Sequence, residues 1–393
     1  MSGSNTVEKF PVLITTCLVS SIGAMSFNAM PVLLGGLAET RALNESELSA
    51  IASAIFFGSL IAVFSAVYWV NRLSWRLVII VMAIATILIS AFLPFIAGHI
   101  QLTMLLALLG FVMGALYSPA LAALSLSRTP ERAFAIAIAL QVAVSALVAY
   151  SLPVFLTPAL GLWAIPCVLM ITSILVLLCI SWLPERSSDP VEATESDVKA
   201  PRKQVLTGIL GLMAMCVFYI GLIGAWEFLE RIGNSWSLSH EYIGGIIALA
   251  LIVGAGGALF PMVLGDRFGK VRPVILAIVL LLAAAILLSV QGTALRFAAG
   301  AILLNVGWNL AIPFMYASLA DADPSGRFVV FSVSIQMAGA VIGAGIAGAL
   351  VVGVGFSGLF TFFGGCVLMA LAIHTLVVRR LMASSSNSVG EID

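Results

Sequence analysis

The sequence contains few charged residues. Only 9% of its 393 residues are Asp, Glu, Lys or Arg, whereas 62% are hydrophobic and the mean hydropathy is +1.17. A soluble domain carries about a quarter charged residues. This scarcity excludes a soluble globular protein and indicates a chain that lies mostly in lipid.

Cysteine and histidine are also scarce, and they are scattered along the chain. The five cysteines show no CxxC spacing, and we interpret them as small apolar packing residues. His99, His240 and His374 lie in separate segments, and neither HExxH nor GxSxG occurs. The sequence therefore argues against a membrane-embedded enzyme, and it predicts neither a cofactor nor a metal site.

Long windows without charge define the predicted membrane spans. A helix crosses the hydrocarbon core with about 20 apolar residues, and runs this continuous differ from the alternating strands of a membrane barrel. Twelve spans are predicted: 11–37, 48–70, 77–97, 101–125, 133–157, 162–183, 205–231, 242–264, 273–291, 296–319, 328–353 and 357–378. We therefore expect an all-α integral membrane protein with twelve transmembrane helices.

The basic residues predict the orientation of these spans. An even number of spans puts both termini on one side, and all but three of the 18 Lys and Arg residues fall on that side. The exceptions are Arg41, Arg231 and Arg296. The positive-inside rule assigns the basic side to the cytoplasm. We expect a multi-pass protein of the cell (inner) membrane with both termini cytoplasmic.

One long polar segment, 184–203, divides the chain. It is rich in Ser, Pro, Glu and Asp, which is typical of a flexible linker. We expect an N-terminal six-helix half over 1–183, a cytoplasmic linker over 184–203, a C-terminal six-helix half over 204–380 and a cytoplasmic tail over 381–393. Because six spans return the chain to its starting side, the halves are parallel repeats.

The two halves carry the same polar residues at a constant separation. The pairs, each 195 residues apart, are Arg72 with Arg267, Arg132 with Arg327, and Gln141 with Gln336. Each arginine lies in a short polar break, and each glutamine lies inside the span that follows. Two similar membrane halves are typical of secondary transporters, so the repeat predicts transport by alternating access.

The loop between the eighth and ninth spans reads Gly265-Asp266-Arg267-Phe268-Gly269-Lys270. It resembles the cytoplasmic loop signature of the major facilitator superfamily, G-x-x-x-D-R-x-G-R/K, and Pro130-Glu131-Arg132 resembles the end of that superfamily's span-four motif. The resemblance implies the twelve-helix fold with two parallel repeats. It also implies a conformational latch at the cytoplasmic helix ends, where an acid can face a helix N-terminus. We expect this latch to comprise Asp266, Arg267, Arg72 and Arg132.

The sequence departs from the family pattern at several positions. Asn71 and Ser74 replace the acid and the glycine of the signature in the first half, so we expect a weaker latch there. Gly110 takes the place of the arginine that heads the span-four motif, and that arginine is linked to proton coupling in relatives. Span five also lacks the Gly-Pro run of the drug/proton antiporters. The resemblance therefore names a superfamily and leaves the subfamily open.

Polar residues inside the spans are candidate site residues, because polar groups are costly to bury in lipid. The candidate substrate-binding residues are Asn28, Tyr117, Gln141, Tyr219, Trp226, Asn305, Asn309 and Gln336. In the family, spans one, four, seven and ten line the central cavity, and most of these residues lie on those spans. Hydrogen bonding between helices is the alternative role for the amides, and an interfacial position is the alternative for Trp226.

Glu227 is the deepest carboxylate in the predicted spans. Arg231 lies four residues later and can pair with it along one helix face. In one interpretation Glu227 takes up and releases a proton, with Arg231 beside it. In the other, the two residues form a structural ion pair below the outer surface.

Together these features predict a secondary active transporter that moves a small organic solute by alternating access with proton coupling. We expect a monomer in the lipid bilayer with no nucleic-acid partner. An uncoupled facilitator (uniporter) is one alternative. An efflux pump for drug-like or amphipathic solutes is the other.

Overall fold

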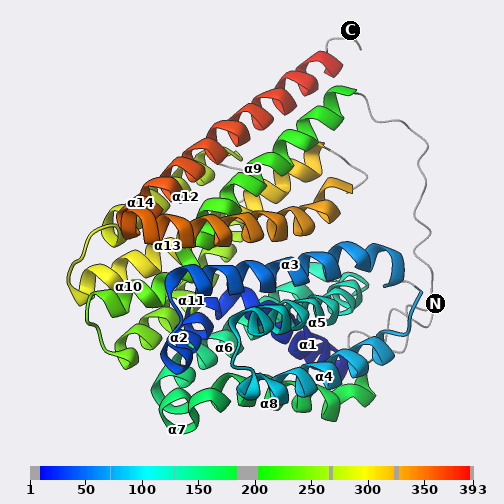
Figure 1. Ribbon diagram of the computed structural model, residues 1–393. Coiled ribbons are helices and arrows are strands. Elements are labelled where there is room, and N and C mark those ends of the chain that lie inside the picture. The colour runs from blue at the N-terminus through cyan, green and yellow to red at the C-terminus, as the bar shows by residue number, and fades with distance from the viewer. Residues whose placement is uncertain are drawn as a thin grey trace. The chain divides into compact units, whose positions relative to one another are not determined.

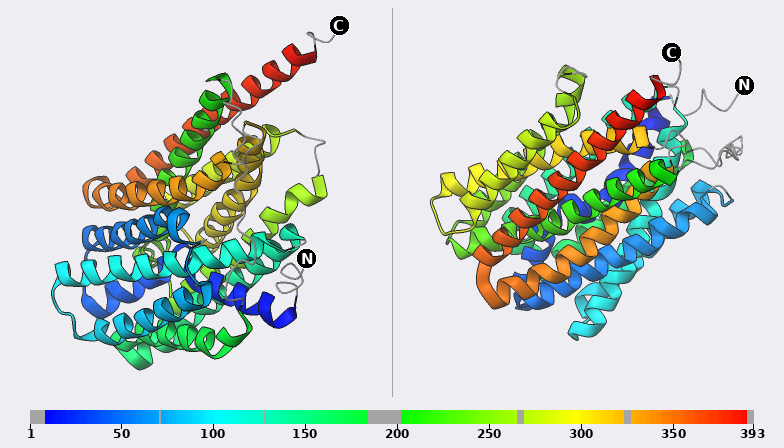
Figure 2. Two further views of the ribbon diagram at one scale, coloured as in Figure 1. Left: turned by 90° about the vertical axis from the view of Figure 1, so that its right-hand side faces the viewer. Right: turned by 90° about the horizontal axis from the view of Figure 1, so that it is seen from above.

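The computed structural model describes residues 9–70, 72–127, 129–183, 202–264, 269–322 and 327–389. Every regular element in these ranges is a helix, as Figures 1 and 2 show, which confirms the all-α prediction. Apolar segments adopt helices in lipid because a helix satisfies its own backbone hydrogen bonds.

The first six predicted spans correspond to helices α1 to α8. These are α1 Phe10–Asn28, α2 Met30–Arg41, α3 Glu45–Trp69, α4 Trp75–Phe92, α5 His99–Ser125, α6 Pro130–Ser151, α7 Thr157–Leu160 and α8 Ala164–Cys179. A π-helical turn over Leu152–Leu156 joins α6 to α7, and Gly161 then adopts a φ of +53°. This positive φ favours glycine. The break lies where the sequence separates spans five and six.

The last six predicted spans correspond to helices α9 to α14. These are α9 Arg202–Glu227, α10 Leu229–Ser235, α11 His240–Leu264, α12 Arg272–Leu288, α13 Ala294–Ala322 and α14 Arg327–Val389. Two helices make up α14, because Gly355 interrupts it with a φ of 72°. That interruption lies between the predicted spans 328–353 and 357–378.

The helices have the length and composition that membrane crossing requires. The described residues include 9 helical segments that are long and apolar enough to cross. Two of these, Arg132–Trp182 and Phe331–Ala383, are 51 and 53 residues long and each hold two predicted spans. The shorter apolar helix Arg272–Leu288 corresponds to the ninth span. All twelve predicted spans therefore have a helical counterpart.

Two predicted spans are not continuous helices. The span predicted over 11–37 breaks at Ala29, where α1 ends and α2 begins with Pro31 in its first turn. Proline lacks an amide hydrogen and fits most readily in the first turn of a helix, so Pro31 favours a new helix start at this break. The span predicted over 205–231 breaks at Phe228, whose ψ of 2° is not helical. The short helices α2 and α10 follow these breaks.

The chain forms two compact units. Unit 1 comprises Met1–Ala193 with Glu227–Ile252, and unit 2 comprises Thr194–Trp226 with Val253–Asp393. The boundary between them passes through α9 and α11, so α10 and the start of α11 pack with the first six spans. The division into halves at the 184–203 linker stays a prediction, and most of that segment lies outside the described residues.

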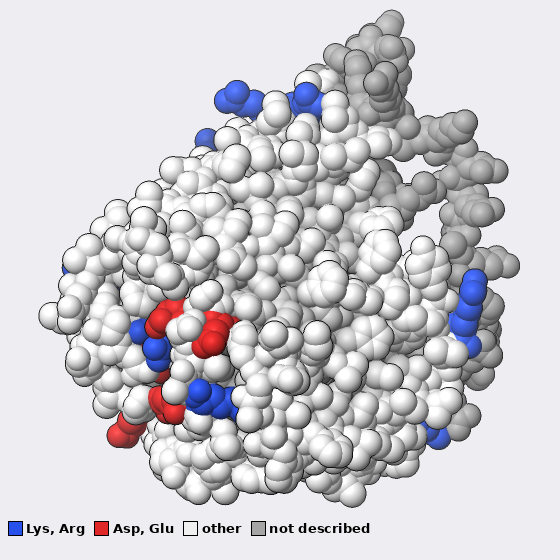
Figure 3. All heavy atoms as spheres, in the orientation of Figure 1, with Lys and Arg blue, Asp and Glu red and all other residues white. Residues whose placement is uncertain are grey.

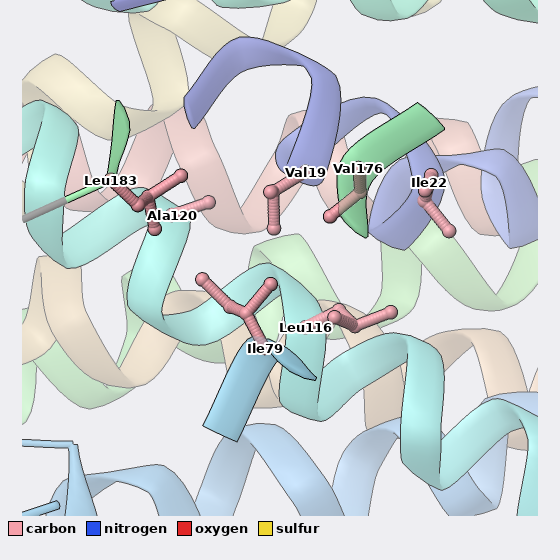
Figure 4. Close-up of a cluster of buried hydrophobic side chains, with 7 residues drawn as sticks. All are labelled: Val19, Ile22, Ile79, Leu116, Ala120, Val176 and Leu183. Atoms are coloured by element: carbon pink, nitrogen blue, oxygen red, sulfur yellow. The ribbon is translucent and has the colours of Figure 1, made fainter. Parts of the chain in front are cut away.

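Glycines allow close helix packing in unit 1. A Cβ atom added to Gly58 of α3 would lie 1.9 Å from the Ala107 carbonyl oxygen of α5, so no side chain fits there. A separate cluster joins α1, α4, α5 and α8 (Figure 4), and its buried side chains are Val19, Ile22, Ile79, Leu116, Ala120, Val176 and Leu183. These contacts supply the apolar packing that holds the helices together.

Unit 2 uses the same kind of packing. A Cβ atom on Gly343 of α14 would lie 2.3 Å from the Ile220 carbonyl oxygen of α9, and one on Gly307 of α13 would lie 2.8 Å from Leu281 of α12. Small residues at such contacts are typical of membrane helices, whose association depends on close backbone approach. The glycine spacing therefore fixes which helices become neighbours.

Candidate functional site

Glu227 is the last residue of α9 and is fully buried, with 0% of its surface exposed. Neither of its carboxylate oxygens has a hydrogen-bond partner among the residues that the structure describes. A buried carboxylate without a counter-charge is costly in its charged form. Such a group is suited to carry a proton, or to bind a ligand that supplies the missing partner.

Arg231 does not pair with Glu227. Its Nη2 atom lies 3.0 Å from Oε1 of Glu45, the first residue of α3. The break at Phe228 ends α9 after Glu227, so the two residues no longer share one continuous helix face. The predicted pairing along the helix is therefore wrong, and Glu45 is an ion-pair partner that the sequence analysis missed. Asn44 and Glu47 form a capping box that marks this helix start.

Three aromatic rings meet in unit 2. The Trp308 ring packs edge-on against Tyr219, with centroids 6.2 Å apart, and against Trp226, with centroids 6.0 Å apart. The Trp308 Nε1 atom lies 3.5 Å from the Tyr219 hydroxyl oxygen, at the limit of a hydrogen bond. The structure thus brings Tyr219 and Trp226 of α9 together with Trp308 of α13. All three side chains are buried, so the rings pack against one another and against their neighbours.

Asn305 and Asn309 form a linked amide pair on α13. Asn309 donates from Nδ2 to the backbone and side-chain oxygens of Asn305, at 2.9 and 3.0 Å. Asn305 is 1% exposed, and its own Nδ2 has no partner in the part of the chain that the structure describes. It packs against Gly254 of α11, where an added Cβ would lie 1.9 Å from the Asn305 Oδ1 atom. The spare amide hydrogens of Asn305 are available to a bound polar group.

The two repeat-related glutamines have different partners. Gln141 of α6 donates from Nε2 to the Ser20 hydroxyl of α1 at 3.1 Å and is buried. Gln336 of α14 is half-buried and donates to the Tyr316 hydroxyl of α13. Each bond joins two helices of one unit, as expected for interhelical hydrogen bonding. Neither bond excludes a further role in solute binding.

The remaining candidate binding residues lie on α1 and α5. Asn28 is half-buried at the last position of α1, directly before the break at Ala29. Tyr117 is half-buried on α5 and packs against Gly23 of α1, where an added Cβ would lie 2.5 Å from the Tyr117 Cβ. Both residues belong to unit 1, whereas the aromatic cluster belongs to unit 2.

The predicted latch is described only in part. Asp266 and Arg267 lie outside the described residues. Arg72 lies in the turn after α3 and Arg132 in the first turn of α6, and both are exposed. Their role as a latch stays a prediction.

The end of the signature loop is described and makes contacts that the sequence analysis missed. Gly269 adopts a φ of +63°, which explains a glycine at this position. Lys270 forms an ion pair with Asp321 of α13 and donates to the Ala317 carbonyl at 3.2 Å. The buried His374 of α14 bonds the Lys270 carbonyl oxygen at 3.2 Å. The loop is thus tied to two helices of unit 2.

Comparisons with known proteins identify the fold. No protein-family model matches the sequence, and no curated protein matches it. A solved structure of a D-xylose-proton symporter aligns with a TM-score of 0.71 at 12% identity, over 93% of this chain and 97% of the symporter. A bacterial homologue of the human lysosomal transporter Spinster, in an inward-facing and unoccupied conformation, aligns with a TM-score of 0.67 at 14% identity. That alignment covers 96% of this chain and 98% of the homologue.

The protein is a multi-pass membrane protein with the fold of the major facilitator superfamily. The structural similarity extends over nearly the whole chain, so it confirms the fold that the signature loop implied. At 12% and 14% identity, the two alignments show the fold and do not identify a solute.

Proposed function

We propose that this protein is a secondary transporter that moves a small organic solute by alternating access and couples this movement to protons. The fold supports the first part, because both similar structures are transporters and one is a proton symporter. The second part depends on the residues of this chain. We also propose that it works as a monomer in the cell (inner) membrane, with cytoplasmic termini and no nucleic-acid partner.

The observation that carries the proton coupling is the state of Glu227. It is fully buried, and both oxygens lack a hydrogen-bond partner within the described ranges. Because Arg231 forms an ion pair with Glu45, a proton is the simplest species that can neutralise the Glu227 carboxylate. Glu227 would take up a proton when water reaches it from one side and release it when water reaches it from the other. Arg231 then serves to anchor α10, not to neutralise Glu227.

The candidate binding residues favour an uncharged polar or amphipathic solute. Tyr219, Trp226 and Trp308 form a buried aromatic cluster, and the buried Asn305 amide has donors without a partner among the described residues. Alternating access would expose both to the solute. Aromatic stacking with amide hydrogen bonds is a common way to bind ring-shaped solutes that carry hydroxyl or carbonyl groups. Asn309 and Gln336 would add polar contacts within unit 2, and Asn28, Tyr117 and Gln141 stay candidate binding residues of unit 1.

An uncoupled uniporter is the second candidate function, and Gly110 favours it. This glycine occupies the place of the family's coupling arginine, and an added Cβ would lie 2.0 Å from the Ile55 carbonyl oxygen. The α3–α5 contact therefore has no room for that arginine. Coupling, where it exists in this chain, must use another residue, and Glu227 is the candidate.

Transport by purified protein in liposomes tests the proposal. A panel of labelled sugars, polyols and amphipathic amides would be offered with and without an inward proton gradient. We expect at least one solute to accumulate above equilibrium only when the gradient is present. Glu227→Gln should abolish this accumulation while solute exchange without a gradient continues, because the amide keeps the shape and cannot carry the proton.

Glu241→Gln is the matched control, since Glu241 is an exposed carboxylate in the first turn of α11. It should behave as the wild type in both assays. Gradient-driven accumulation that survives in Glu227→Gln would remove Glu227 from the coupling mechanism. Equilibration that never responds to a gradient would establish the uniporter.

A further inference from the structure

Three potential metal ligands converge at one end of unit 1. Glu39 lies near the end of α2, Glu230 lies in the first turn of α10, and His240 is the first residue of α11. A carboxylate oxygen of each glutamate and a ring nitrogen of His240 all lie within 4.8 Å of one another. Figure 3 shows acidic side chains gathered with basic ones over α2 and α10, whereas elsewhere on this face only basic side chains are seen, near its edges.

Glu230 is the unusual member of this group. It is 3% exposed, although it is a carboxylate, and it lies against Gly35 of α2, where an added Cβ would be 2.5 Å from Oε2. Its Oε1 atom accepts a hydrogen bond from Asn234 at 2.6 Å. Its Oε2 atom has no hydrogen-bond partner among the described residues. A buried carboxylate oxygen beside a second carboxylate calls for a cation.

Neither of the nearby basic residues, Arg231 and His240, hydrogen-bonds to the Oε2 atom of Glu230. Arg231 is the nearest basic residue in sequence, but its guanidinium lies 3.0 Å from Glu45. His240 lies 2.9 Å from Glu39 through Nδ1, so a protonated His240 would offset one carboxylate of the pair. Arg231 offsets part of the negative charge on Glu230, but the Oε2 atom of Glu230 still has no hydrogen-bond partner among the described residues. A divalent cation balances both carboxylates and leaves His240 neutral, as a metal ligand must be.

We propose that Glu39, Glu230 and His240 form a binding site for a divalent transition-metal ion, with Zn²⁺ as the best-matched ion. One imidazole nitrogen and two carboxylate oxygens are zinc ligands, and water would complete a tetrahedral site. The imidazole ligand disfavours Ca²⁺ and Mg²⁺, which prefer oxygen alone. Ligand atoms of a tetrahedral zinc ion lie about 3.4 Å apart, so small side-chain movements would bring the three into contact with it.

The site has a structural consequence. The three ligands come from three helices, so a bound ion would fasten α10 to α2 and α11 within unit 1. Only Phe228 separates Glu227 from α10, and the ion would thus hold the segment that follows Glu227. The site does not depend on the identity of the solute. It would allow metal ions in the surrounding solution to regulate the protein.

Metal binding to the purified full-length protein, with any affinity tag removed, tests the site. Equilibrium dialysis with Zn²⁺, followed by elemental analysis, should give one ion per chain, and Mg²⁺ and Ca²⁺ should not compete. Glu230→Gln, Glu39→Gln and His240→Gln should each weaken Zn²⁺ binding at least about tenfold. Glu241→Gln is the control, because this exposed carboxylate adjoins His240 and is outside the ligand set.

A second measurement separates loss of binding from loss of folding. Zn²⁺ should raise the thermal unfolding temperature of the wild type and of Glu241→Gln, because a ligand that binds the folded state stabilises it. The three ligand variants should elute as folded protein and show no such shift. Absence of binding to the wild type would overturn the proposal. Binding that is unchanged in Glu230→Gln and His240→Gln would assign the ion to another site and would overturn it equally.

Discussion

The α3–α5 pair of unit 1 and the α11–α13 pair of unit 2 occupy corresponding places in the repeat, but they distribute polar groups in opposite ways. In unit 1, α3 carries Ser59, whose hydroxyl donates to the Gly110 carbonyl of α5 at 2.9 Å. In unit 2, the counterpart of Ser59 is Gly254, and the counterpart of Gly110 is Asn305, each 195 residues later. In unit 2 the polar side chain therefore belongs to the other helix of the pair.

This exchange shows how one scaffold can support two roles. Gly114 and Asn309 repeat the pattern one helical turn further along α5 and α13. In unit 1 the glycines allow close backbone contact, and the Ser59 hydroxyl donates its hydrogen bond to a carbonyl oxygen of α5. In unit 2 the glycine makes room for asparagine side chains, and the Nδ2 atom of Asn305 has no partner in the part of the chain that the structure describes. The first arrangement favours packing, and the second favours binding.

Installing the unit 2 residue in unit 1 should have the largest effect. Gly110→Asn would place a Cβ atom only 2.0 Å from the Ile55 carbonyl oxygen. Because the obstacle is backbone, we expect a loss of about 3 kcal/mol or more in unfolding free energy. Thermal unfolding of the purified variant measures this loss. Adding Ser59→Gly should not rescue it, and Gly256→Ala, where an added Cβ meets nothing within 4 Å, should unfold like the wild type. Normal stability of Gly110→Asn would show that the two helix pairs are interchangeable.

Much of this architecture could be predicted from the sequence. The absence of charge over long windows located the spans, and the signature loop around Gly269 indicated the fold. Both signals are local, so they can be read along the chain. The 195-residue repeat also pairs Gln141 with Gln336, and each of them hydrogen-bonds to another helix.

The contacts of the site could not be predicted in the same way. Arg231 pairs with Glu45, which is 186 residues away in the chain. The helix break at Phe228 permits this pairing, and no proline at that position predicts the break from the sequence. Glu39 is similarly remote from Glu230 and His240. Such contacts depend on which helices become neighbours and on glycines such as Gly35, where the absence of a side chain leaves room for Glu230.

The second prediction tests the glycine of unit 2. Gly254→Ala would place a Cβ 1.9 Å from the Asn305 Oδ1 atom, which belongs to a side chain and can move. We expect a cost of about 1–3 kcal/mol, smaller than that of Gly110→Asn. Asn305→Ala should relieve most of it in the double variant, giving a coupling energy of about 0.5–3 kcal/mol in unfolding measurements. Additive losses would mean that Asn305 does not occupy the space that Gly254 leaves.

The third prediction compares the two glutamines. Gln141→Leu and Gln336→Leu each remove one interhelical hydrogen bond, and such bonds contribute about 0.6 kcal/mol in membrane proteins. We expect similar small losses of stability in the two variants. Transport should separate them. Gln336 is half-buried beside Tyr316, so Gln336→Leu should raise the solute KM more than Gln141→Leu does, because Gln141 is buried and bonds to Ser20. Equal KM changes in both variants would contradict this division between packing and binding.

The smallest expected effect concerns the loops that follow the second span of each half. Ser74 caps α4 by accepting from the Leu77 amide, whereas Lys270 in the second half pairs with Asp321. The Lys270 and Asp321 side chains are 27% and 50% exposed, and surface ion pairs contribute about 0–1 kcal/mol. Lys270→Met should therefore lower stability by about 0.5 kcal/mol at low salt and by less at high salt, because salt screens exposed charges. Lys270→Arg keeps the charge and should be neutral. A large, salt-independent loss in Lys270→Met would instead mean that unit 2 depends on this loop for folding. The hydrogen bond that the His374 ring donates to the Lys270 carbonyl oxygen would then be the contact to test next.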